Sequence, residues 1–377
     1  VEKMDETRTR SEDILPSKQS NVHQTISNLK ESAADIEDVA MDRTKFDLKA
    51  LSGQMPKTLP EKCPKEPSVR RSTILLPNPE KPLRVVATFT TLPDRYDLVR
   101  ESIKSMRAQD WPLDAIYLAV PLRARRLNQE YPPIPDDINE LCTVIRIDVD
   151  YGPVTKLYGG LISEIDPDTI IISCDDDVIY KPNLVRKLVE HFQQHPGISI
   201  CGTGALIGKG LPFISIISSL SPFRTWNGLI GPLVPKGGRA VDLIFGVAGV
   251  LYQRGFFPDV ANLHDEFLRY SLENEYVFVN DDVLISGYLS RKGIKRMVFY
   301  DIPDVTCQGG NRKDALSYDL MSMLVKLDRS ITYMKSQGFF PATESVELDE
   351  TPAGRVIFAI VIAVLILVLC FFFYRLV

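Results

Sequence analysis

The sequence predicts an α/β protein with a largely parallel central sheet flanked by helices, followed by one membrane-spanning helix. From Leu83 onward, short apolar runs rich in β-branched residues alternate with amphipathic segments of helical period, as strands and crossover helices do. One such run, at 170–173, is followed almost at once by three aspartates, Asp175 to Asp177. Near the other end, residues 356–374 carry no charge. These features separate a folded part from a membrane part.

Composition excludes several classes of protein. The chain of 377 residues is 45% apolar and 25% charged, which is ordinary for a globular protein, and its net charge of −5 argues against a nucleic-acid surface. Its six cysteines form no CxxC pair and no zinc spacing, and there are only four histidines. We therefore expect free thiols in a reduced compartment, without a disulfide framework or a His-rich metal site.

The first 82 residues read as an arm and a linker. Residues 1–52 are polar and poor in aromatics, with apolar positions in steps of four and three at Val22, Ile26, Leu29, Ala33, Ile36 and Ala40. This spacing fits a short coiled coil that could form a homo-oligomer, or a solvated arm. Residues 53–82 are rich in proline and predict an extended linker.

The folded domain is expected at 83–340. Its predicted strands are 84–90, 114–120, 143–147, 169–174, 198–201, 241–252 and 296–300. Its predicted helices are 96–109, 154–165, 182–195, 260–274, a helix capped by 280–282 that runs to about 291, and 314–337. Residues 202–238 are rich in Gly, Pro and Ser and include Trp226, which predicts long loops over the sheet of a kind that is usually functional.

A linker at 341–355 leads to the predicted membrane helix. Residues 356–374 are almost all Ile, Val, Leu, Phe and Ala, and about nineteen residues span roughly 28 Å as a helix, enough to cross a bilayer core. Arg355 and Arg375 flank the segment. The alternative is a buried core helix. Since no apolar leader precedes the domain, a single-pass C-terminal anchor would leave the folded part in the cytosol.

Three consecutive carboxylates at the end of a buried strand need compensation, because each disfavours ionisation of the others. A divalent cation supplies it, and hard oxygen ligands suit Mg²⁺ or Mn²⁺, which also bind phosphate oxygens. Ligands of open α/β sheets lie at the carboxyl ends of strands. Asp175, Asp176 and Asp177 therefore predict a metal–diphosphate site, with a solvated acidic turn as the alternative.

Two other loops should reach the same edge of the sheet. Lys156 follows the third strand and could bind a phosphate, although a surface lysine on an amphipathic helix is the alternative. Asp150 could bind a base or a ribose hydroxyl. Thr91, Asp94 and Arg95 follow the first strand, where Asp94 could instead cap the loop and Arg95 could be exposed.

Asp281 and Asp282 form a second carboxylate pair at a predicted helix N-terminus. The helix dipole favours an ionised carboxylate there, and such a group can take a proton from an acceptor hydroxyl as general base. The alternative is plain N-capping, which Asn280 or Asp281 alone could supply.

Taken together, these motifs resemble the GT-A-fold glycosyltransferases. The chain is similar to DDD (DXD)-type members of algae, bacteria and large algal viruses over about 83–308. The matching segments are 85–95, 150–156, 171–180 and 245–249, followed by 280–282. The resemblance implies a Rossmann-like GT-A domain that uses Mn²⁺ or Mg²⁺ and a nucleotide-diphosphate sugar, with UDP-sugars favoured.

Within the resemblance, Asp177 would be the main metal ligand. Asp175 would contact the ribose side of the donor and share the metal, and Asp176 would support the metal or the sugar. Asp282 matches the catalytic base of inverting members, with Asp281 as the fallback, so inversion is slightly favoured over retention.

The remaining site residues also follow from the resemblance. Thr90 would belong to the donor-binding loop, and Phe245 and Gly246 would line the donor and acceptor pocket together with Trp226. Many GT-A enzymes add a late histidine to the metal, and no histidine follows His264 here. Metal binding would then rest on the aspartates, the diphosphate and water.

The expected reaction is transfer of the sugar to a glycan, lipid-linked or protein acceptor near the membrane. Two alternatives remain. A nucleotidyltransferase could use a similar aspartate cluster, but the loop at 91–95 is not Gly-rich. A tail-anchored scaffold could retain an inactive transferase fold and recruit partners through its arm.

Overall fold

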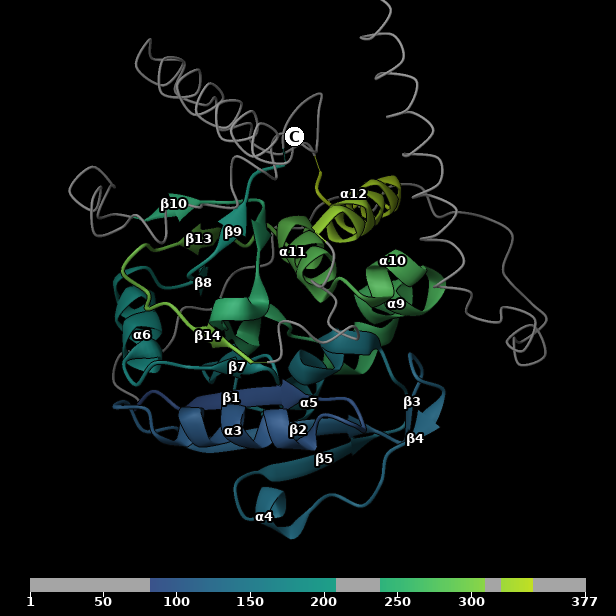
Figure 1. Cartoon of the computed structure of the whole chain (residues 1–377). Coiled ribbons are helices and arrows are strands. Elements are labelled where there is room, and N and C mark those ends of the chain that lie inside the picture. Colours follow the sequence, from purple (N-terminus) through teal and green to yellow (C-terminus); the bar gives the residue numbers. More distant parts are fainter. Residues whose placement is uncertain (1–81, 208–237, 309–319, 342–377) are drawn as a thin grey trace, which may run out of the picture. The chain divides into compact units, whose positions relative to one another are not determined.

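A computed structural model of the chain describes residues 82–207, 238–308 and 320–341, and its central feature is an eight-stranded sheet (Figure 1). The strand order is β10 (Arg239–Ala240), β13 (Arg296–Val298), β8 (Ser199–Cys201), β12 (Val250–Gln253), β6 (Ile170–Ser173), β1 (Val85–Thr90), β2 (Ala115–Pro121) and β5 (Thr143–Ile147). Three two-stranded sheets accompany it: β3 (Arg123–Ala124) with β4 (Gln129–Glu130), β7 (Val178–Ile179) with β14 (Thr306–Cys307), and β9 (Gly204–Ala205) with β11 (Leu243–Ile244).

One half of the large sheet, from β6 to β5, is entirely parallel. β1 pairs in parallel with both β2 and β6, β2 pairs in parallel with β5, and β8 with β13. β12 runs antiparallel to β6 and β8, and β10 runs antiparallel to β13. All of β6 and nearly all of β1 are buried, as apolar strands covered on both faces should be. The predicted α/β class with a largely parallel sheet is therefore confirmed.

The described helices are α3 (Tyr96–Arg107), α4 (Asp136–Asn139), α5 (Thr155–Ser163), α6 (Leu184–Gln194), α9 (Arg269–Glu273), α10 (Glu275–Phe278), α11 (Asp281–Arg291) and α12 (Leu320–Ser336). The helices α9 to α12 are grouped together in Figure 1. α5 lies close to the sheet because it presents glycines: a Cβ on Gly159 would come 2.4 Å from the Cβ of Ala119, and one on Gly160 3.1 Å from Ile171. This approach brings the start of α5 to the edge where β1 and β6 end.

Two predicted elements are wrong as continuous units. The strand expected at 241–252 is interrupted: β11 ends at Ile244, a 3₁₀ turn covers Gly246–Ala248, and β12 begins at Val250. Gly249 has a φ of 73°, which no continuous strand accommodates. The helix expected at 260–274 consists of a 3₁₀ turn, a π-helical turn at His264–Leu268, and α9.

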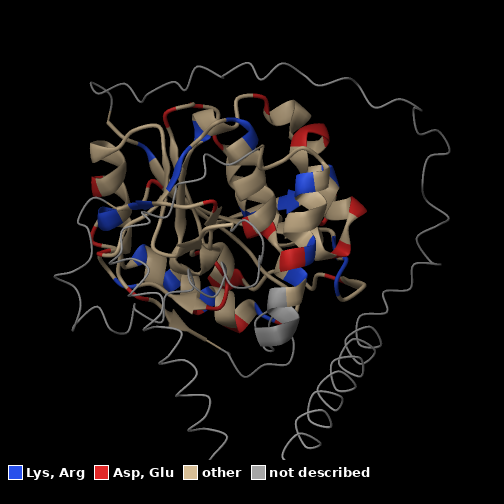
Figure 2. Ribbon diagram, turned by 90° about the horizontal axis from the view of Figure 1, so that it is seen from above, with Lys and Arg blue, Asp and Glu red and all other residues tan. Residues whose placement is uncertain are grey.

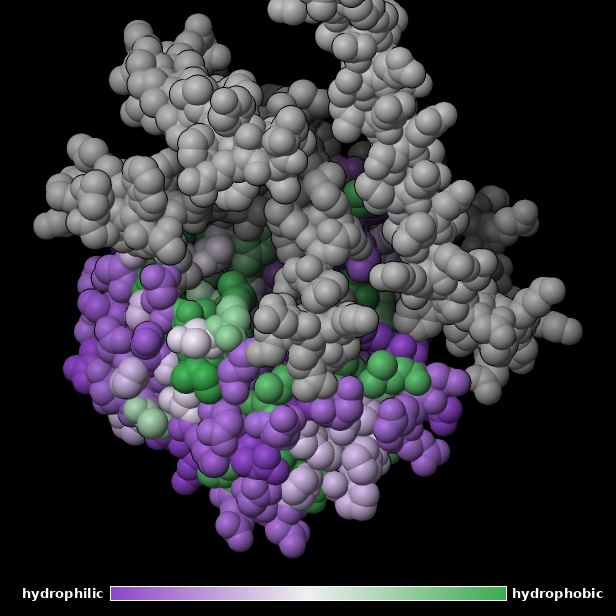
Figure 3. Space-filling model, in the orientation of Figure 1, coloured by the Kyte–Doolittle hydropathy of each residue, from purple (hydrophilic) through white to green (hydrophobic). Residues whose placement is uncertain are grey.

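Smaller differences concern the surface. The β3–β4 hairpin, α4 and α10 were not predicted, because each is only a few residues long. The edge strand β5 exposes Thr143 and Arg146, which protects an edge from unwanted pairing. The part of the face in Figure 3 where Figure 1 shows α4 and β5 is largely hydrophilic. Charges of both signs are interspersed over the described ribbon (Figure 2).

Several predicted segments lie outside the described residues: the arm at 1–52, nearly all of the linker at 53–82, the linker at 341–355 beyond its first residue, and the span at 356–374. Within residues 82–207, 238–308 and 320–341, no helix is both long enough and apolar enough to cross a membrane. The predicted membrane helix therefore stays a prediction.

Candidate active site

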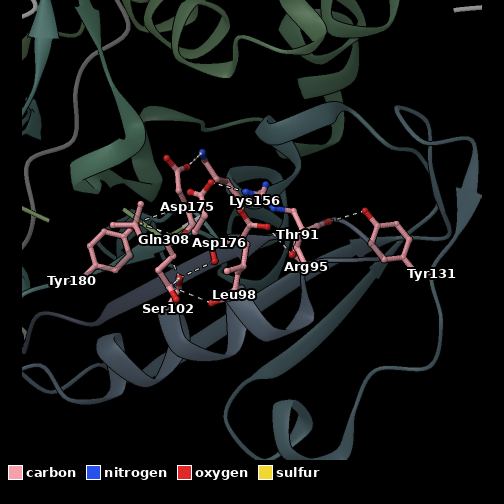
Figure 4. Close-up of polar contacts among 12 residues, drawn as sticks. Thr91, Arg95, Leu98, Ser102, Tyr131, Lys156, Asp175, Asp176, Tyr180 and Gln308 are labelled. Atoms are coloured by element: carbon pink, nitrogen blue, oxygen red, sulfur yellow. Dashed lines mark hydrogen bonds and ion pairs between the residues drawn. The ribbon is translucent and has the colours of Figure 1, made fainter. Parts of the chain in front are cut away.

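The three aspartates that follow β6 lie at the carboxyl edge of the parallel strands, as predicted. β1 and β6 run side by side in register, Thr88 opposite Ser173, so the loops that follow them emerge together. Thr91 and Arg95 come from the first loop and meet the aspartates of the second (Figure 4).

Each of the three carboxylates has different partners. Asp175 accepts a hydrogen bond from Lys156 Nζ at 2.6 Å. Asp176 accepts one from Thr91 Oγ1 at 2.7 Å and lies 3.1 Å from Arg95 Nη1, while Asp177 accepts from Arg95 Nη2 at 2.5 Å. The Asp176 side chain is only 10% exposed, whereas those of Asp175 and Asp177 are 29% and 28% exposed. The outer two therefore face accessible space, and the middle one belongs to the supporting structure.

Lys156 joins the aspartate loop to a second acidic pair. Its Nζ lies 2.6 Å from Asp175 and 2.9 Å from Asp281, in the first turn of α11, and its side chain is 5% exposed. Burial would lower the pKa of Lys156, but Asp175, Asp281 and Asp282 outweigh burial and hold the pKa well above its usual value. The alternative of a surface lysine is therefore wrong, and a charged ammonium lies between the two groups of carboxylates.

Gly246 marks the point where four elements meet. Its N–H donates to Asp282 Oδ1 at 2.9 Å. A Cβ at Gly246 would lie 3.3 Å from Asp282 Oδ1, 3.4 Å from Lys156 Nζ and 3.6 Å from Asp175 Oδ1. The 3₁₀ turn, α11, α5 and the aspartate loop thus bring three charged side chains close to the Cα of Gly246, where any side chain would have to pack against them.

The two neighbouring aspartates of α11 differ in their surroundings. Asp281 is 8% exposed and its carboxylate is ion-paired with Lys156. Asp282 is less buried and faces Gly246. Burial, reinforced by Asp281 and opposed by Lys156, raises the pKa of Asp282 well above its usual range. Asp282 is thus the better placed of the two to exchange a proton with a bound molecule.

Other predicted donor-binding residues have structural partners. Asp150 accepts from the N–H of Gly152 and of Arg125, both at 2.7 Å, so its carboxylate shapes the loop. Thr90 Oγ1 donates to the carbonyl of Ala119 at 2.8 Å, which ties it to β2. Asp94 is exposed in the turn before α3.

The remaining predictions have mixed outcomes. Phe245 is partly buried against the core and its N–H donates to Thr203 O at 2.9 Å. Trp226 lies outside the described residues. Asn280 occupies the N-cap position of α11, but its side chain makes no capping bond and donates instead to Tyr276 O and Ser330 Oγ.

Four residues that support the site were not predicted. Tyr180 OH accepts from the N–H of Asp175 at 2.7 Å, and Tyr131 OH donates to Thr91 O at 2.7 Å. Ser102 Oγ donates to Asp176 O at 2.8 Å, and the N–H of Gln308 donates to Asp177 O at 2.6 Å. Tyr180 stands three residues after Asp177, so the sequence carries a local signal for it. Gln308 is remote in sequence and carries no local signal.

The side chains present fit a divalent cation held with the help of a ligand. Five aspartates, Asp175 to Asp177 with Asp281 and Asp282, meet two cations, Arg95 and Lys156, which leaves three negative charges in excess when all are ionised. Burial raises the pKa of Asp177, and that of Asp176 to about 6. A divalent cation nearby would offset the excess negative charge and lower the pKa of these carboxyl groups.

The arrangement suits a metal bound by few protein ligands. Among the described residues, no group of three or more His, Cys, Asp or Glu side chains is arranged to hold a metal ion. Mg²⁺ and similar ions are commonly bound by one or two carboxylates together with substrate phosphates. Asp175 and Asp177, the two partly exposed members of the triplet, could supply that pair, and a diphosphate would complete it.

No model of a known protein family and no curated protein matches this chain. Among solved structures, it is similar to the mannosyltransferase PcManGT from Pyrobaculum calidifontis in complex with GDP-Man and Mn²⁺, with a TM-score of 0.41, 13% identity, and coverage of 71% of this chain and 73% of that one. It is also similar to TarS 1–349 of S. aureus (TM-score 0.37, 12% identity, coverage 70% and 76%). A third similar structure is glucosyl-3-phosphoglycerate synthase of Mycobacterium tuberculosis in complex with Mn²⁺, UDP-glucose and phosphoglyceric acid. Its TM-score is 0.39 at 12% identity, and the match covers 67% of this chain and 80% of that one. Likenesses at this level assign no function to this chain.

Proposed function

We propose that this protein is a metal-dependent glycosyltransferase of the GT-A type, which moves a sugar from a nucleotide-diphosphate sugar to an acceptor hydroxyl. The observation that carries the proposal is the convergence at Gly246 of Asp175 of the aspartate triplet, the ammonium of Lys156 and the carboxylate of Asp282. A group transfer of this kind needs a place for the diphosphate and a base for the acceptor within one site.

The donor's diphosphate would bind at the carboxyl edge of β1 and β6. Asp175 and Asp177 would hold Mn²⁺ or Mg²⁺, which when bound neutralises negative charge on the diphosphate leaving group. Lys156 is paired with Asp175 and Asp281, so its main role is to hold these carboxylates in position. Arg95 lies beside the triplet and is the described cation nearest to Asp177.

Asp282 would take the proton from the acceptor hydroxyl. Its Oδ1 is held by the N–H of Gly246, so the carboxylate has a fixed direction before any substrate binds, which is what positions a general base. This role belongs to an inverting reaction, which we favour. In a retaining reaction Asp282 would only position the acceptor.

We further propose that the acceptor is a glycan, lipid-linked or protein hydroxyl near a membrane. The support is the charge-free segment at 356–374, which would hold the site within a short distance of a bilayer.

A donor panel tests the proposal. The 377-residue chain is titrated with UDP-, GDP- and dTDP-sugars in Mn²⁺ and then in EDTA, following binding and slow hydrolysis of the donor. The panel includes GDP-mannose and UDP-glucose. Binding of one donor in Mn²⁺ that EDTA abolishes is the expected result. Well-folded protein that binds no donor and shows no metal effect would contradict the proposal and favour an inactive scaffold.

The matched variants are Asp177→Asn and Asp137→Asn. Asp177 is one of the two partly exposed carboxylates of the triplet, and Asp137 is a surface carboxylate on α4 that pairs with Arg100. Only Asp177→Asn should abolish the metal-dependent binding.

A further inference from the structure

Arg95 is fixed by its backbone and buried at the site. It precedes α3, where its N–H donates to Leu92 O at 3.0 Å and its carbonyl accepts from the N–H groups of Leu98 and Val99, both at 3.1 Å. The residue is only 8% exposed. Its guanidinium is forked, with Nη1 near Asp176 at 3.1 Å and Nη2 bonded to Asp177 at 2.5 Å. One cation therefore neutralises two adjacent carboxylates of the triplet.

The two halves of this fork are held unequally. Asp176 has both carboxylate oxygens occupied, one by Thr91 and the other by Arg95, and its side chain is 10% exposed. Its carbonyl is held by Ser102. The Asp177 side chain is 28% exposed. The contact with Asp176 is thus an anchor, and the contact with Asp177 can be exchanged at lower cost.

We propose that Arg95 is the resident counter-ion of Asp177 in the donor-free protein, and that it passes from Asp177 to the diphosphate of the donor when a divalent cation binds Asp177. The proposal rests on the proposed function. Asp176 would keep hold of Nη1 in both states, so the middle carboxylate of the triplet acts as the pivot of Arg95 and not as a metal ligand.

The chemistry makes binding of the cation and of the diphosphate interdependent. Without a diphosphate, a cation must break the charge-assisted hydrogen bond between Arg95 and Asp177 and offers the guanidinium no anion in exchange. With a diphosphate, the displaced Nη2 gains an anionic oxygen, for which the planar guanidinium fork is well suited. Each ligand should therefore strengthen the binding of the other by the same factor.

The test measures Mn²⁺ binding by the electron paramagnetic resonance signal of free Mn²⁺, using the 377-residue chain with and without UDP or GDP. In the unaltered protein, we expect weak binding alone and binding at least about 10-fold tighter with the diphosphate, within the usual range of coupling. In Arg95→Gln, Mn²⁺ alone should bind about 5- to 20-fold more tightly, and the diphosphate should add little.

Two further variants sharpen the result. Arg100→Gln removes an arginine in α3, whose partner Asp137 is on the surface, and should change neither affinity. Arg95→Lys keeps the charge but can pair with only one carboxylate at a time. It should change the Mn²⁺ affinity, with and without the diphosphate, in the same direction as Arg95→Gln but by a smaller factor. If Arg95→Gln does not fold, Arg95→Lys decides the question.

Unchanged or weaker Mn²⁺ binding in the folded Arg95 variant, while the unaltered protein binds Mn²⁺ with UDP or GDP, would overturn the role of Arg95 and leave the proposed function intact. If the unaltered protein binds no Mn²⁺ even with a diphosphate, both proposals fall together. The two failures are therefore distinguishable.

Discussion

At the scale of single residues, Asp281 and Asp282 show how one position along a helix changes the role of a carboxylate. Asp281 is 8% exposed and pairs with Lys156 at 2.9 Å, so replacing it would leave a buried ammonium short of a partner. Asp282 accepts a hydrogen bond from the N–H of Gly246, and its Oδ1 lies 3.3 Å from the position that a Cβ on Gly246 would take. We therefore expect the two side chains to differ in what their loss affects.

Asp282→Asn should lower kcat by about 10²- to 10⁴-fold, as loss of a general base does, with the affinity for the donor little changed. Asp281→Asn should mainly lower stability and donor affinity, because it removes a partner of Lys156. Steady-state kinetics with the identified donor, together with donor titration, checks both variants. A normal kcat in Asp282→Asn would exclude this residue as the base.

Gly246→Ala tests the convergence of charged side chains at Gly246 directly. The added methyl would lie 3.3 to 3.6 Å from Asp282, Lys156 and Asp175, which the fold can tolerate but a bound substrate cannot share. We expect a melting temperature within a few degrees of the unaltered protein and at least about a 10-fold loss of kcat/KM, or about 1.4 kcal/mol of transition-state stabilisation. Unimpaired turnover would place the reacting groups elsewhere.

At the scale of elements, the aspartate loop is held by helix α3. Ser102 is fully buried on α3, and its Oγ donates to Asp176 O and accepts from the N–H of Val178 at 3.2 Å. Gln308, beyond β14, donates to the same hydroxyl at 3.3 Å. A hydroxyl on a helix thereby sets the backbone path of the loop that carries the metal-binding carboxylates.

Ser102→Ala should cost about 1–3 kcal/mol of unfolding free energy, because it leaves buried backbone groups without their partner. It should also weaken metal-dependent donor binding, since the loop loses its support. Urea denaturation and donor titration measure the two effects. The control is Ser163→Ala on α5, whose hydroxyl only bonds to Gly159 O one turn back, and which should change stability by no more than about 0.5 kcal/mol.

The opposite edge of the sheet has a separate ionic cluster. Glu164, after α5, accepts two bonds from Arg84 at 2.9 Å each and one from Tyr117 OH at 2.7 Å. Burial would raise the pKa of Glu164, but Arg84 and Tyr117 outweigh burial and lower the pKa below its usual value. The stabilisation is therefore complete above the unfolded pKa of about 4.5 and is lost as the pH falls through the lower pKa of the folded state.

Glu164→Gln should accordingly lower the unfolding free energy at pH 7 by about 1–3 kcal/mol and flatten its decline below pH ~4.5. Urea denaturation at a series of pH values checks both effects. Glu101→Gln, which removes an exposed pair with Lys104, should leave the profile unchanged. An equally steep acid decline in Glu164→Gln would assign the pH dependence to other carboxylates.

At the scale of the whole molecule, the buried strands and the aspartate triplet can be predicted from the sequence, whereas the ion pairs within the site cannot. The runs at β1 and β6 and the triplet after β6 are visible in the sequence because burial demands apolar, β-branched residues and the triplet interrupts them. The break at Gly249 depends on a positive φ, and a run of apolar residues on both sides of it hides the break. A run of apolar residues, or one in which apolar and polar residues alternate, does not show where the chain turns within it.

The sequence predicts which residues form the site better than it predicts which of them pair with one another. Lys156 and Asp281 are far apart in sequence, and their ion pair depends on how α5 and α11 pack in the folded domain. Asp150 lies in the expected loop, but its carboxylate accepts hydrogen bonds from the backbone N–H groups of Arg125 and Gly152 and shapes the loop. The sequence indicates which site residues lie at this edge of the sheet. Which side chain each of them pairs with depends on how the helices and the sheet pack together.

The membrane prediction belongs to the whole chain. We propose that residues 356–374 form a single-pass anchor and that the folded domain faces the cytosol. A segment without charge, apolar on every face, would gain by leaving water for a bilayer core. The full chain should therefore float with liposomes and resist carbonate extraction, while a variant ending at residue 341 should remain in solution, and the domain in sealed microsomes should be open to added protease. A full chain that stays in solution without detergent would instead indicate that the segment packs as a helix within the protein.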